Sequence, residues 1–335
     1  MAKNPPSVSG EDRLIARYFR PLARHPGAFG LMDDAAALSP PDGADLVMTA
    51  DAIVADIHFL SDDPPDSVAR KALRVNLSDL AAKGADAAGF LLSLALPDDV
   101  ADAWLTDFAK GLGEDADTYS CPLLGGDTVR RKGPVLVSIA AFGFVPRGKM
   151  VARQGAKPGD QVIVTGTIGD AALGLRLRQD SVAAKGWQLT PAAADHLVSR
   201  YRLPQPRSTL ARAVRDHASA AMDVSDGLAG DLAKLCLASA VSADVKISRV
   251  PLSPVAQQAI AAEPQAIETV LSGGDDYEIV AAVAPDKAGS FLRACAMAGV
   301  AAAVIGEIVE GNETPRFLRE DGSVMNLARL SFSHF

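Results

Sequence analysis

The sequence predicts an α+β fold of two domains, each a mixed or antiparallel β-sheet backed by helices. The chain has 335 residues, enough to build two hydrophobic cores. Stretches with strand-like and helix-like apolar spacing follow one another without the strict alternation that a parallel sheet would need. The segment Arg147–Asp160 is rich in Gly, Lys, Arg and Pro, as is typical of a domain boundary. We therefore expect one domain over residues 1–150 and a second over residues 151–335.

Caps, apolar spacing and stop signals define the elements of the first half. Ser9 and Asp12 have the spacing of a helix cap, so a helix is expected to begin there. A second helix opens at Pro64 and runs to about Lys83, where Gly84 stops it. Leu46–Ala50 is expected to be a strand that ends at Asp51. The remaining predictions are strands at Phe90–Leu96 and Val135–Val145 and a helix at Asp98–Gly111.

Strands and helices also follow one another irregularly in the second half. The predicted strands are Gln161–Gly166, Met222–Val224, Tyr277–Val283, Ala301–Ile308 and Arg316–Leu318. The predicted helices are Asp170–Gln179, Pro191–Tyr201, Gln205–His217, Leu228–Ala238 and Lys287–Ala298. Residues 180–190 are expected to form a loop, and whether that loop is a lid stays open.

Charge and composition exclude several classes of protein. The formal net charge is −8, which argues against a nucleic-acid partner. No apolar run approaches the roughly 18 residues of a membrane helix, so no membrane span is expected. The three cysteines lie far apart and the five histidines have no zinc-site spacing. The N-terminus lacks the apolar stretch of a signal peptide, and we expect a cytoplasmic protein with reduced thiols.

Short segments that carry aspartate, which we expect to be turns, are the strongest chemical signal. Aspartate supplies 19 of the 21 acidic residues in the first 150 positions. The segments are Asp33-Asp34, Thr49-Ala50-Asp51, Asn76-Leu77-Ser78-Asp79, Gly125-Gly126-Asp127 and Asp223-Val224-Ser225-Asp226-Gly227. Mg²⁺ takes oxygen ligands, usually one or two carboxylates together with phosphate and water. Any single aspartate also fits a cap or a turn, but Asp79 lies in an apolar helical run where aspartate is disfavoured.

Other familiar motifs are missing or incomplete. Gly143–Lys149 matches a phosphate loop, but Met150 replaces the hydroxyl residue that would hold Mg²⁺, so we interpret it as a chance match. No spacing suggests a Ser/His/Asp triad. His58 and Arg153 fit either a structural role or contacts to a ligand. Composition and motifs together therefore indicate a two-domain enzyme with an oxygen-ligand metal and phosphate chemistry.

At these residues the chain resembles the thiamine-monophosphate kinase family. The motifs stand in order and span nearly the whole chain. They are Asp33-Asp34-Ala-Ala, Thr49-Ala-Asp51, Ile57-His58-Phe59, Asn76-Leu-Ser-Asp79-Leu-Ala-Ala-Lys-Gly-Ala, Gly125-Gly-Asp127-Thr, Arg153-Gln-Gly-Ala-Lys-Pro-Gly-Asp160, Val164-Thr-Gly-Thr, Asp223-Val-Ser-Asp226-Gly-Leu, Ser272-Gly-Gly-Asp275-Asp-Tyr-Glu278 and Ser333-His334-Phe335.

The resemblance implies an activity and an organisation. The implied reaction is the ATP-dependent phosphorylation of thiamine monophosphate to thiamine diphosphate, by direct in-line transfer of the γ-phosphoryl group with several Mg²⁺ ions. The implied fold is that of the superfamily that includes aminoimidazole ribonucleotide synthetase. Its N-terminal domain would bind ATP and Mg²⁺ and form a homodimer, and its C-terminal domain would complete the nucleotide and substrate site.

The resemblance also implies roles for individual residues. The implied metal ligands are Asp34, Thr49, Asp51, Asp79, Asp127, Asp223 and Asp226. The implied nucleotide contacts are Tyr119, Gly126, Asp127, Arg153 and Ser225. The implied substrate contacts are His58, Asp275 and Phe332. No residue is expected to act as a general base, because the phosphate acceptor is already largely dianionic at pH 7, and Mg²⁺ and Arg153 would neutralise the charge of the transition state.

Three positions depart from the family pattern, and three rival hypotheses stay open. Met32 stands where Gly is common, Ala50 where a hydroxyl residue is common, and Asp275 where Glu is common. One rival is another ATP-dependent enzyme of the superfamily that acts on a different oxyanion or amide. Residues 1–30 hold no cysteine, which argues against a selenophosphate synthetase. The other rivals are a non-catalytic regulator that binds nucleotide and Mg²⁺, and an aspartate-based phosphatase.

Overall fold

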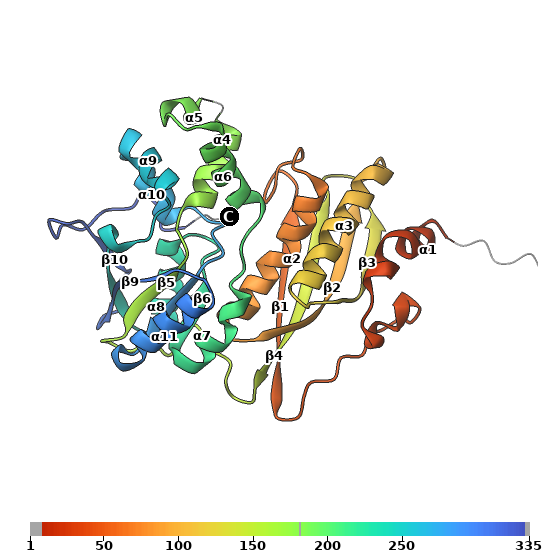
Figure 1. Ribbon diagram of the computed structural model, residues 1–335, viewed down its shortest axis with the longest axis horizontal. Coiled ribbons are helices and arrows are strands. Elements are labelled where there is room, and N and C mark those ends of the chain that lie inside the picture. Colours follow the sequence, from red (N-terminus) through yellow and green to blue (C-terminus); the bar gives the residue numbers. More distant parts are fainter. Residues whose placement is uncertain (1–8, 181, 332–335) are drawn as a thin grey trace, which may run out of the picture. The chain divides into compact units, whose positions relative to one another are not determined.

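The computed structural model describes residues 9–180 and 182–331. The chain divides into two compact units. The first unit comprises Met1–Asp42, Met48–Asn76 and Ala87–Phe144, and the second comprises Gly43–Val47, Leu77–Asp86 and Val145–Phe335. Each unit contains one β-sheet with helices packed on it, so the predicted α+β fold is confirmed (Figure 1).

The first unit is a four-stranded sheet with two long helices on one face. The strand order is β1-β4-β2-β3, and β2 and β3 run parallel. In β4 the buried residues alternate with more exposed ones, as in a strand that has one covered face. The elements that lie wholly or mainly in this unit are β1 (Ala44–Val54), α2 (Pro65–Ala82), β2 (Asp86–Leu96), α3 (Asp102–Thr118), β3 (Leu123–Arg130) and β4 (Leu136–Pro146). The end of α2, from Leu77 on, belongs to the second unit.

A chain of short helical turns precedes this sheet. The expected cap is confirmed, because Ser9 and Asp12 form a capping box at the start of α1 (Gly10–Leu14). A π-helix at Ile15–Phe19 and 3₁₀ turns at Arg20–Leu22 and Pro26–Leu31 follow.

The second unit is built on a six-stranded mixed sheet. Its strand order is β10-β7-β9-β5-β8-β6. β7 and β10 run parallel, and the pairs β7–β9, β9–β5, β5–β8 and β8–β6 are antiparallel. The strands are β5 (Gln161–Thr165), β6 (Ala218–Asp223), β7 (Ser242–Lys246), β8 (Ile279–Val283), β9 (Ala302–Val309) and β10 (Arg316–Leu318).

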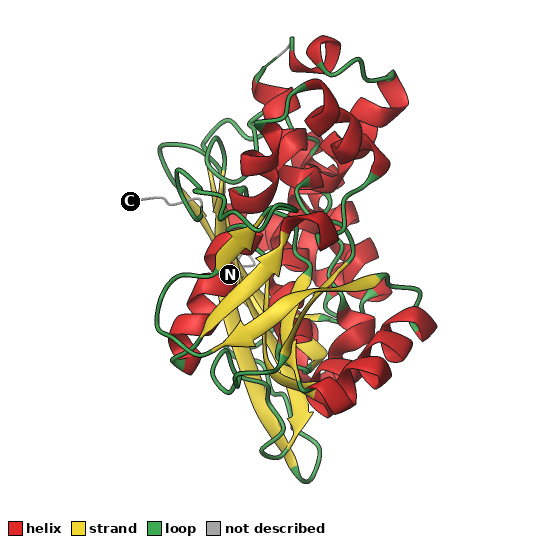
Figure 2. Cartoon of the chain, turned by 90° about the vertical axis from the view of Figure 1, so that its left-hand side faces the viewer, coloured by secondary structure: helices red, strands yellow, loops and turns green. Residues whose placement is uncertain are grey.

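Helices cover both faces of this second sheet (Figure 2). Val162 and Val164 of β5 belong to one apolar core, and Ile163 between them belongs to the other. That arrangement explains why the three central residues of β5 and all of β8 are apolar. The helices are α4 (Asp170–Gln179), α5 (Ala183–Gly186), α6 (Pro191–Arg202), α7 (Ala211–His217), α8 (Leu228–Ser239), α9 (Pro254–Ala262), α10 (Ala266–Ser272) and α11 (Pro285–Met297), with 3₁₀ turns at Ser208–Leu210 and Ile247–Arg249.

The segment expected as a loop at residues 180–190 is partly helical. It contains α5, and it is anchored by Trp187, which is 2% exposed. The indole Nε1 of Trp187 donates to Glu263 Oε2 at 2.9 Å, and the guanidinium of Arg176 lies over the ring. The described part of this segment is therefore tied to the body of the second unit. No helix within the described residues is both long and apolar enough to cross a bilayer.

Candidate functional site

In the first unit, β1 carries Thr49 and Asp51 in its interior. The expectation that the strand ends at Asp51 is wrong, because β1 is paired in the sheet and continues to Val54. The backbone N–H of Asp51 donates to Oδ1 of Asn76 at 3.1 Å, and Asn76 is fully buried in α2. This bond holds the Asp51 backbone in place while its side chain stays exposed.

The segment Gly125-Gly126-Asp127 also lies inside a strand rather than in a turn. Asp127 is exposed on β3, opposite Ser93 of β2. Gly126 has a φ of +154°, and a β-carbon there would lie 1.8 Å from the carbonyl oxygen of Leu92. Only glycine allows this close approach of the two strands, and the register shift in β2 lies just before it.

His58 lies in the turn that follows β1. Its Nδ1 accepts a hydrogen bond from the backbone N–H of Val54 at 3.2 Å, so a neutral ring would carry its proton on Nε2. The Nζ of Lys71, which is 1% exposed, donates to the carbonyl oxygen of His58 at 2.8 Å. A buried lysine of α2 therefore fixes the turn that carries this predicted substrate contact.

Tyr119 caps the C-terminus of α3 above a buried ion pair. The guanidinium of Arg74 lies 5.6 Å from the centre of the Tyr119 ring. Arg74 is itself held by Asp115, with Nε–Oδ2 at 2.5 Å and Nη2–Oδ1 at 3.0 Å, and Arg70 contacts the same carboxylate at 2.6 Å. Sequence reasoning missed Arg74 and Asp115, because only the packing of α2 on α3 brings them together.

Asp34 lies on the exposed bend that follows the turn Pro26–Leu31. That turn has positive φ at Phe29 and Leu31 (48° and 55°), which costs energy for residues other than glycine.

In the second unit, the two loops with the highest density of predicted site residues lie side by side. The N–H of Asp275 donates to the carbonyl of Ser225 at 2.8 Å, and the N–H of Tyr277 donates to the carbonyl of Val224 at 2.8 Å. Asp275 and Tyr277 have positive φ values of 75° and 51°. Strained backbone of this kind persists where surrounding contacts enforce it, and it is concentrated at functional sites. The structure therefore brings a predicted nucleotide contact next to a predicted substrate contact.

Asp223 and Asp226 flank the first of these loops. Asp223 ends β6 and is 4% exposed, as the prediction of a carboxylate at a strand end requires. The N–H of Asp226 donates to Oδ2 of the buried Asp231 at 2.8 Å. Lys234 contacts the carboxylate of Asp226 and also Oδ1 of Asp231 at 2.8 Å. Burial raises the pKa of Asp231, against the pull of Lys234.

A buried polar cluster lies below the second loop. Glu278 is fully buried and accepts from Arg200 (3.0 Å), Arg207 (2.5 Å) and Thr165 (2.8 Å). Asp276 is 1% exposed, and its Oδ2 accepts from the N–H of Gly169 at 2.8 Å. Burial raises the pKa of Asp276 well above its ordinary value. The cluster joins the loop of Asp275 to β5 and to the start of α4.

Asp79 and Arg153 are the remaining predicted residues of the second unit. Asp79 is half-buried near the end of α2. Arg153 is exposed, and its carbonyl oxygen accepts from Ser239 Oγ at 3.2 Å. Ser239 Oγ also accepts from the N–H groups of Gly155 and Ala156 at 3.2 Å, which fixes the shape of this segment. Phe332 lies outside the described residues.

The donor set suits a hard cation only in part. All the predicted metal ligands offer oxygen, the donor type that Mg²⁺ prefers. Over residues 9–180 and 182–331, no three His, Cys, Asp or Glu side chains converge in a group that could hold a metal by itself. Mg²⁺ commonly uses one or two carboxylates and completes its shell with phosphate and water. The oxygen donors of these residues therefore suit a Mg²⁺ ion whose shell phosphate and water complete.

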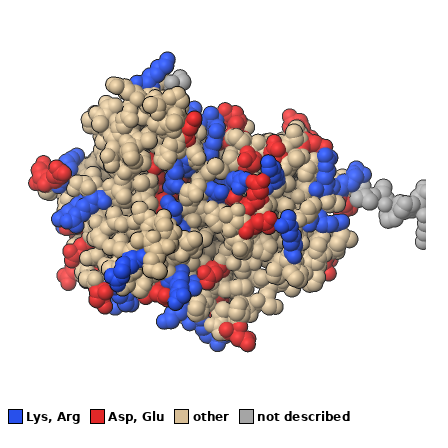
Figure 3. All heavy atoms as spheres, in the orientation of Figure 1, with Lys and Arg blue, Asp and Glu red and all other residues tan. Residues whose placement is uncertain are grey.

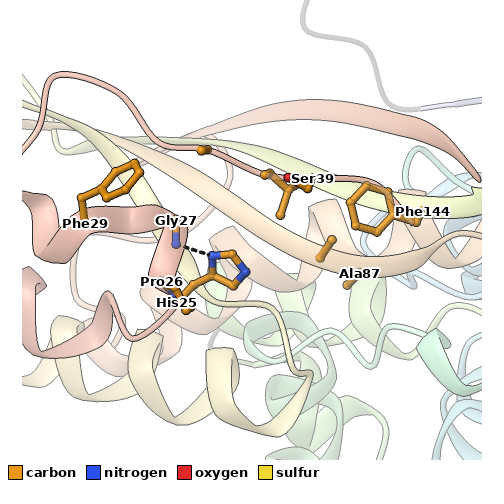
Figure 4. A pocket seen from close by; sticks show the side chains of 10 residues that line it. His25, Pro26, Gly27, Phe29, Ser39, Ala87 and Phe144 are labelled. Atoms are coloured by element: carbon orange, nitrogen blue, oxygen red, sulfur yellow. Dashed lines mark hydrogen bonds between the residues drawn. The ribbon is translucent and has the colours of Figure 1, made fainter. Parts of the chain in front are cut away.

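The first unit also contains a pocket of about 580 Å³. His25, Phe29 and Ser39 line it together with Ala87 of β2 and Phe144 of β4 (Figure 4). His25 Nδ1 accepts from the N–H of Gly27 at 3.0 Å and so caps the turn at the rim. None of the predicted site residues in the described chain lines this pocket, so it is no candidate for the reaction.

Two family models match successive parts of the chain. The N-terminal domain of AIR synthase related proteins matches residues 32–145. The C-terminal domain of the same proteins matches residues 157–317.

Relatives resemble the chain over nearly its full length. The thiamine-monophosphate kinase of Caulobacter vibrioides is 45% identical, and the match covers 96% of this chain and 89% of the relative. The crystal structure of the thiamine-monophosphate kinase of Stenotrophomonas maltophilia matches with a TM-score of 0.81 at 36% identity, covering 94% of this chain and 96% of that one. AaThiL complexed with AMPPCP and TMP matches with a TM-score of 0.75 at 28% identity, covering 92% and 97%.

Proposed function

Because the chain belongs to the thiamine-monophosphate kinase family, we propose that it transfers the γ-phosphoryl group of ATP to thiamine monophosphate, forming thiamine diphosphate and ADP. The observation that carries this function is the pairing of the two loops in the second unit. A phosphotransferase must hold its two phosphate substrates next to each other, and Ser225 and Asp275 are joined by a backbone hydrogen bond.

The reaction needs no general base. The acceptor is a phosphate monoester with a second pKa near 6, so roughly nine-tenths of it is already dianionic at pH 7. The obstacle is the repulsion between this dianion and the phosphates of ATP. The chain must therefore position both substrates in line and offset their charge.

Each proposed residue has a task that suits its chemistry. Arg153 is exposed and can donate two parallel hydrogen bonds to a phosphate. Because Nδ1 of His58 accepts from Val54, a neutral ring would present its proton to a substrate acceptor at Nε2. The negative charge of Asp275 would complement the positive thiazolium ring. The positive φ of Asp275 determines the direction in which its short side chain leaves the backbone.

Magnesium is part of the proposal. When bound, Mg²⁺ would neutralise the phosphate charges that the substrates bring together. Three of the proposed ligands in the first unit, Asp34, Asp51 and Asp127, are exposed, so they are accessible to a metal–nucleotide complex. In the second unit, Asp79, Asp223 and Asp226 would serve the same purpose.

We also propose a homodimer formed through the N-terminal domain. The sheet of the first unit has helices on one face, while Met48 of β1 and Val129 of β3 are 67% and 48% exposed. We propose that a second copy of the chain covers these apolar side chains of the sheet, because their burial in a dimer interface would be stabilising. Dimer dissociation on changing Met48 to lysine would support this, and a wild-type chain that sediments as a monomer would overturn it.

The domain boundary at residue 150 and the cytoplasmic location complete the proposal. Residues 1–150 would hold the ATP, Mg²⁺ and dimer functions, and residues 151–335 would complete the site. The three cysteines are free and buried, which suits a reducing compartment.

On the face shown in Figure 3, acidic and basic side chains are interspersed, so that face offers no continuous basic track for a nucleic acid.

ADP release, measured with and without thiamine monophosphate, tests the function. The proposed kinase releases ADP only when the acceptor is present. A phosphatase would hydrolyse ATP without it, and a regulator would release no ADP under either condition. A different enzyme of the superfamily would stay inactive until its own acceptor was supplied.

A further inference from the structure

Lys83 occupies the junction of three segments that each carry a proposed site residue. It follows the last residue of α2, one helical turn after Asp79, and its N–H donates to the carbonyl of Asp79 at 3.0 Å. Residues four apart on a helix share a face, so the Lys83 side chain leaves the helix on the side of Asp79. All the contacts described below lie within the second unit.

The side chain and backbone of Lys83 bond to the two other segments. Its Nζ donates to the carbonyl of Ala221 at 2.7 Å, two residues before Asp223 in β6. Its carbonyl accepts from the N–H of Val151 at 3.1 Å, two residues before Arg153. The N–H of Ala221 donates to the carbonyl of Ala152 at 3.0 Å and closes the ring of contacts.

The ammonium group also lies in the electrostatic field of these residues. Burial, and after it the charge of Arg153, lower the pKa of Lys83 to about 8, although Asp223 and Asp79 act in the opposite direction. Burying a cation costs free energy, and a neutral side chain could fill the same space without that cost. A buried lysine at this position therefore suggests that its charge has a function.

We propose that Lys83 is a positioning residue of the nucleotide–metal site. Lys83 holds the segments of Asp79, Arg153 and Asp223 in a fixed arrangement and offsets part of the negative charge of the two aspartates. This inference rests on the proposed function of those three residues. It differs from a general structural role, because the bonds of Lys83 described above go to segments that carry proposed metal and nucleotide residues. Loss of the ammonium group should therefore weaken the binding of ATP and Mg²⁺ far more than the binding of thiamine monophosphate.

Lys83→Met is the test variant, because methionine keeps an unbranched apolar stem and removes only the charge and the donor. The expected result is a rise on the order of tenfold in KM for ATP and in the Mg²⁺ concentration needed for half-maximal rate, with KM for thiamine monophosphate unchanged. Lys83→Arg keeps a charged donor and should recover most of the loss.

Arg215→Met is the matched control. Arg215 binds the segment that follows α2, because its Nη1 donates to the carbonyl of Gly84 and to Oδ2 of Asp86, each at 2.9 Å, and neither of these partners is a proposed site residue. Its loss should lower the melting temperature without separating the two KM values. If Lys83→Met and Arg215→Met behave alike, or if both KM values rise together, Lys83 is only a structural tie and the inference fails.

A binding measurement separates this inference from the proposed function. The rise in melting temperature on adding Mg²⁺ and AMPPCP should be smaller for Lys83→Met than for wild type and Lys83→Arg. If the wild type binds AMPPCP but forms no ADP with thiamine monophosphate, the proposed function is wrong, and the melting data alone decide the role of Lys83. An equal rise for all variants overturns the inference. If Lys83→Met does not fold, Lys83→Gln takes its place.

Discussion

Glu278→Gln should destabilise the second unit strongly, because it removes a buried negative charge that two arginines contact. Glu278 is fully buried, and its oxygens accept from Arg200, Arg207 and Thr165. A β-carbon on residue 166 would lie 2.0 Å from Oε1, so the carboxylate occupies the space that glycine leaves open there. Glutamine keeps the shape, but it turns an amide toward guanidinium groups that are less than one-fifth exposed.

The magnitude follows from the burial. Removing one partner of a buried ion pair costs about 3–5 kcal/mol, because a charge is left in the interior without compensation. In a folding unit of roughly 200 residues, each kcal/mol lowers the melting temperature by about 2–4 °C. We therefore expect a fall of about 6–20 °C in the melting temperature of the second unit.

Tryptophan fluorescence can report this unit by itself. The chain has two tryptophans, and Trp187 is buried in the second unit while Trp104 belongs to the first. In a Trp104→Phe background, the emission of Trp187 follows the second unit only. Glu307→Gln, at an exposed position of β9, is the matched control and should change the melting temperature little. A shift for Glu278→Gln no larger than that of the control would refute the reasoning.

Three further changes test the site. Asp51→Asn or Asp127→Asn should lower turnover by orders of magnitude with unchanged circular dichroism; unchanged turnover at saturating Mg²⁺ would remove them from the metal site. Lys234→Met should strengthen Mg²⁺ binding in the presence of AMPPCP, measured by calorimetry, because the ammonium contacts Asp226 and competes for it; weaker binding would contradict this. Asp276→Asn should stabilise the protein more at pH 8 than at pH 4.5 in urea unfolding. Folding raises the pKa of Asp276, so the wild-type protein loses stability as the pH rises above the ordinary pKa of an aspartate, and the asparagine variant has no such loss. An equal effect of the substitution at both pH values would show that the pKa of this carboxyl is not raised.

Local signals were enough to predict many of the elements. The helix Asp170–Gln179 and the strand Arg316–Leu318 have the expected bounds. The cap at Ser9 is also formed as expected. In these places the apolar spacing, the cap and the turn residues agree with the tertiary structure, so neighbouring residues alone define the element.

The errors arose where distant residues decide the structure. Gly126 marks a close approach to Leu92 of the adjacent strand and not a turn, and no local pattern distinguishes the two. Similarly, β1 continues past Asp51 because it is paired in the sheet. The segment of Trp187 is held by Glu263, which lies far along the chain.

The motifs of the candidate site could be predicted from the sequence, but the contacts that hold these motifs in place could not. The loops of Ser225 and Asp275 were recognised from their sequences, and the structure joins them through a hydrogen bond that the sequence could not supply. The contacts of Arg74 with Asp115 and of Lys83 with Ala221 depend on how α2 packs. The one available signal was that Lys83 follows Asp79 by one helical turn.

Transfer of a labelled γ-phosphate tests the central claim most directly. ATP labelled at the γ position is incubated with the protein, Mg²⁺ and thiamine monophosphate, and the products are separated after a single turnover. Direct transfer predicts that all the released label is found in thiamine diphosphate, in equal amount to ADP. Label in inorganic phosphate, or label that first appears on the protein, would contradict it.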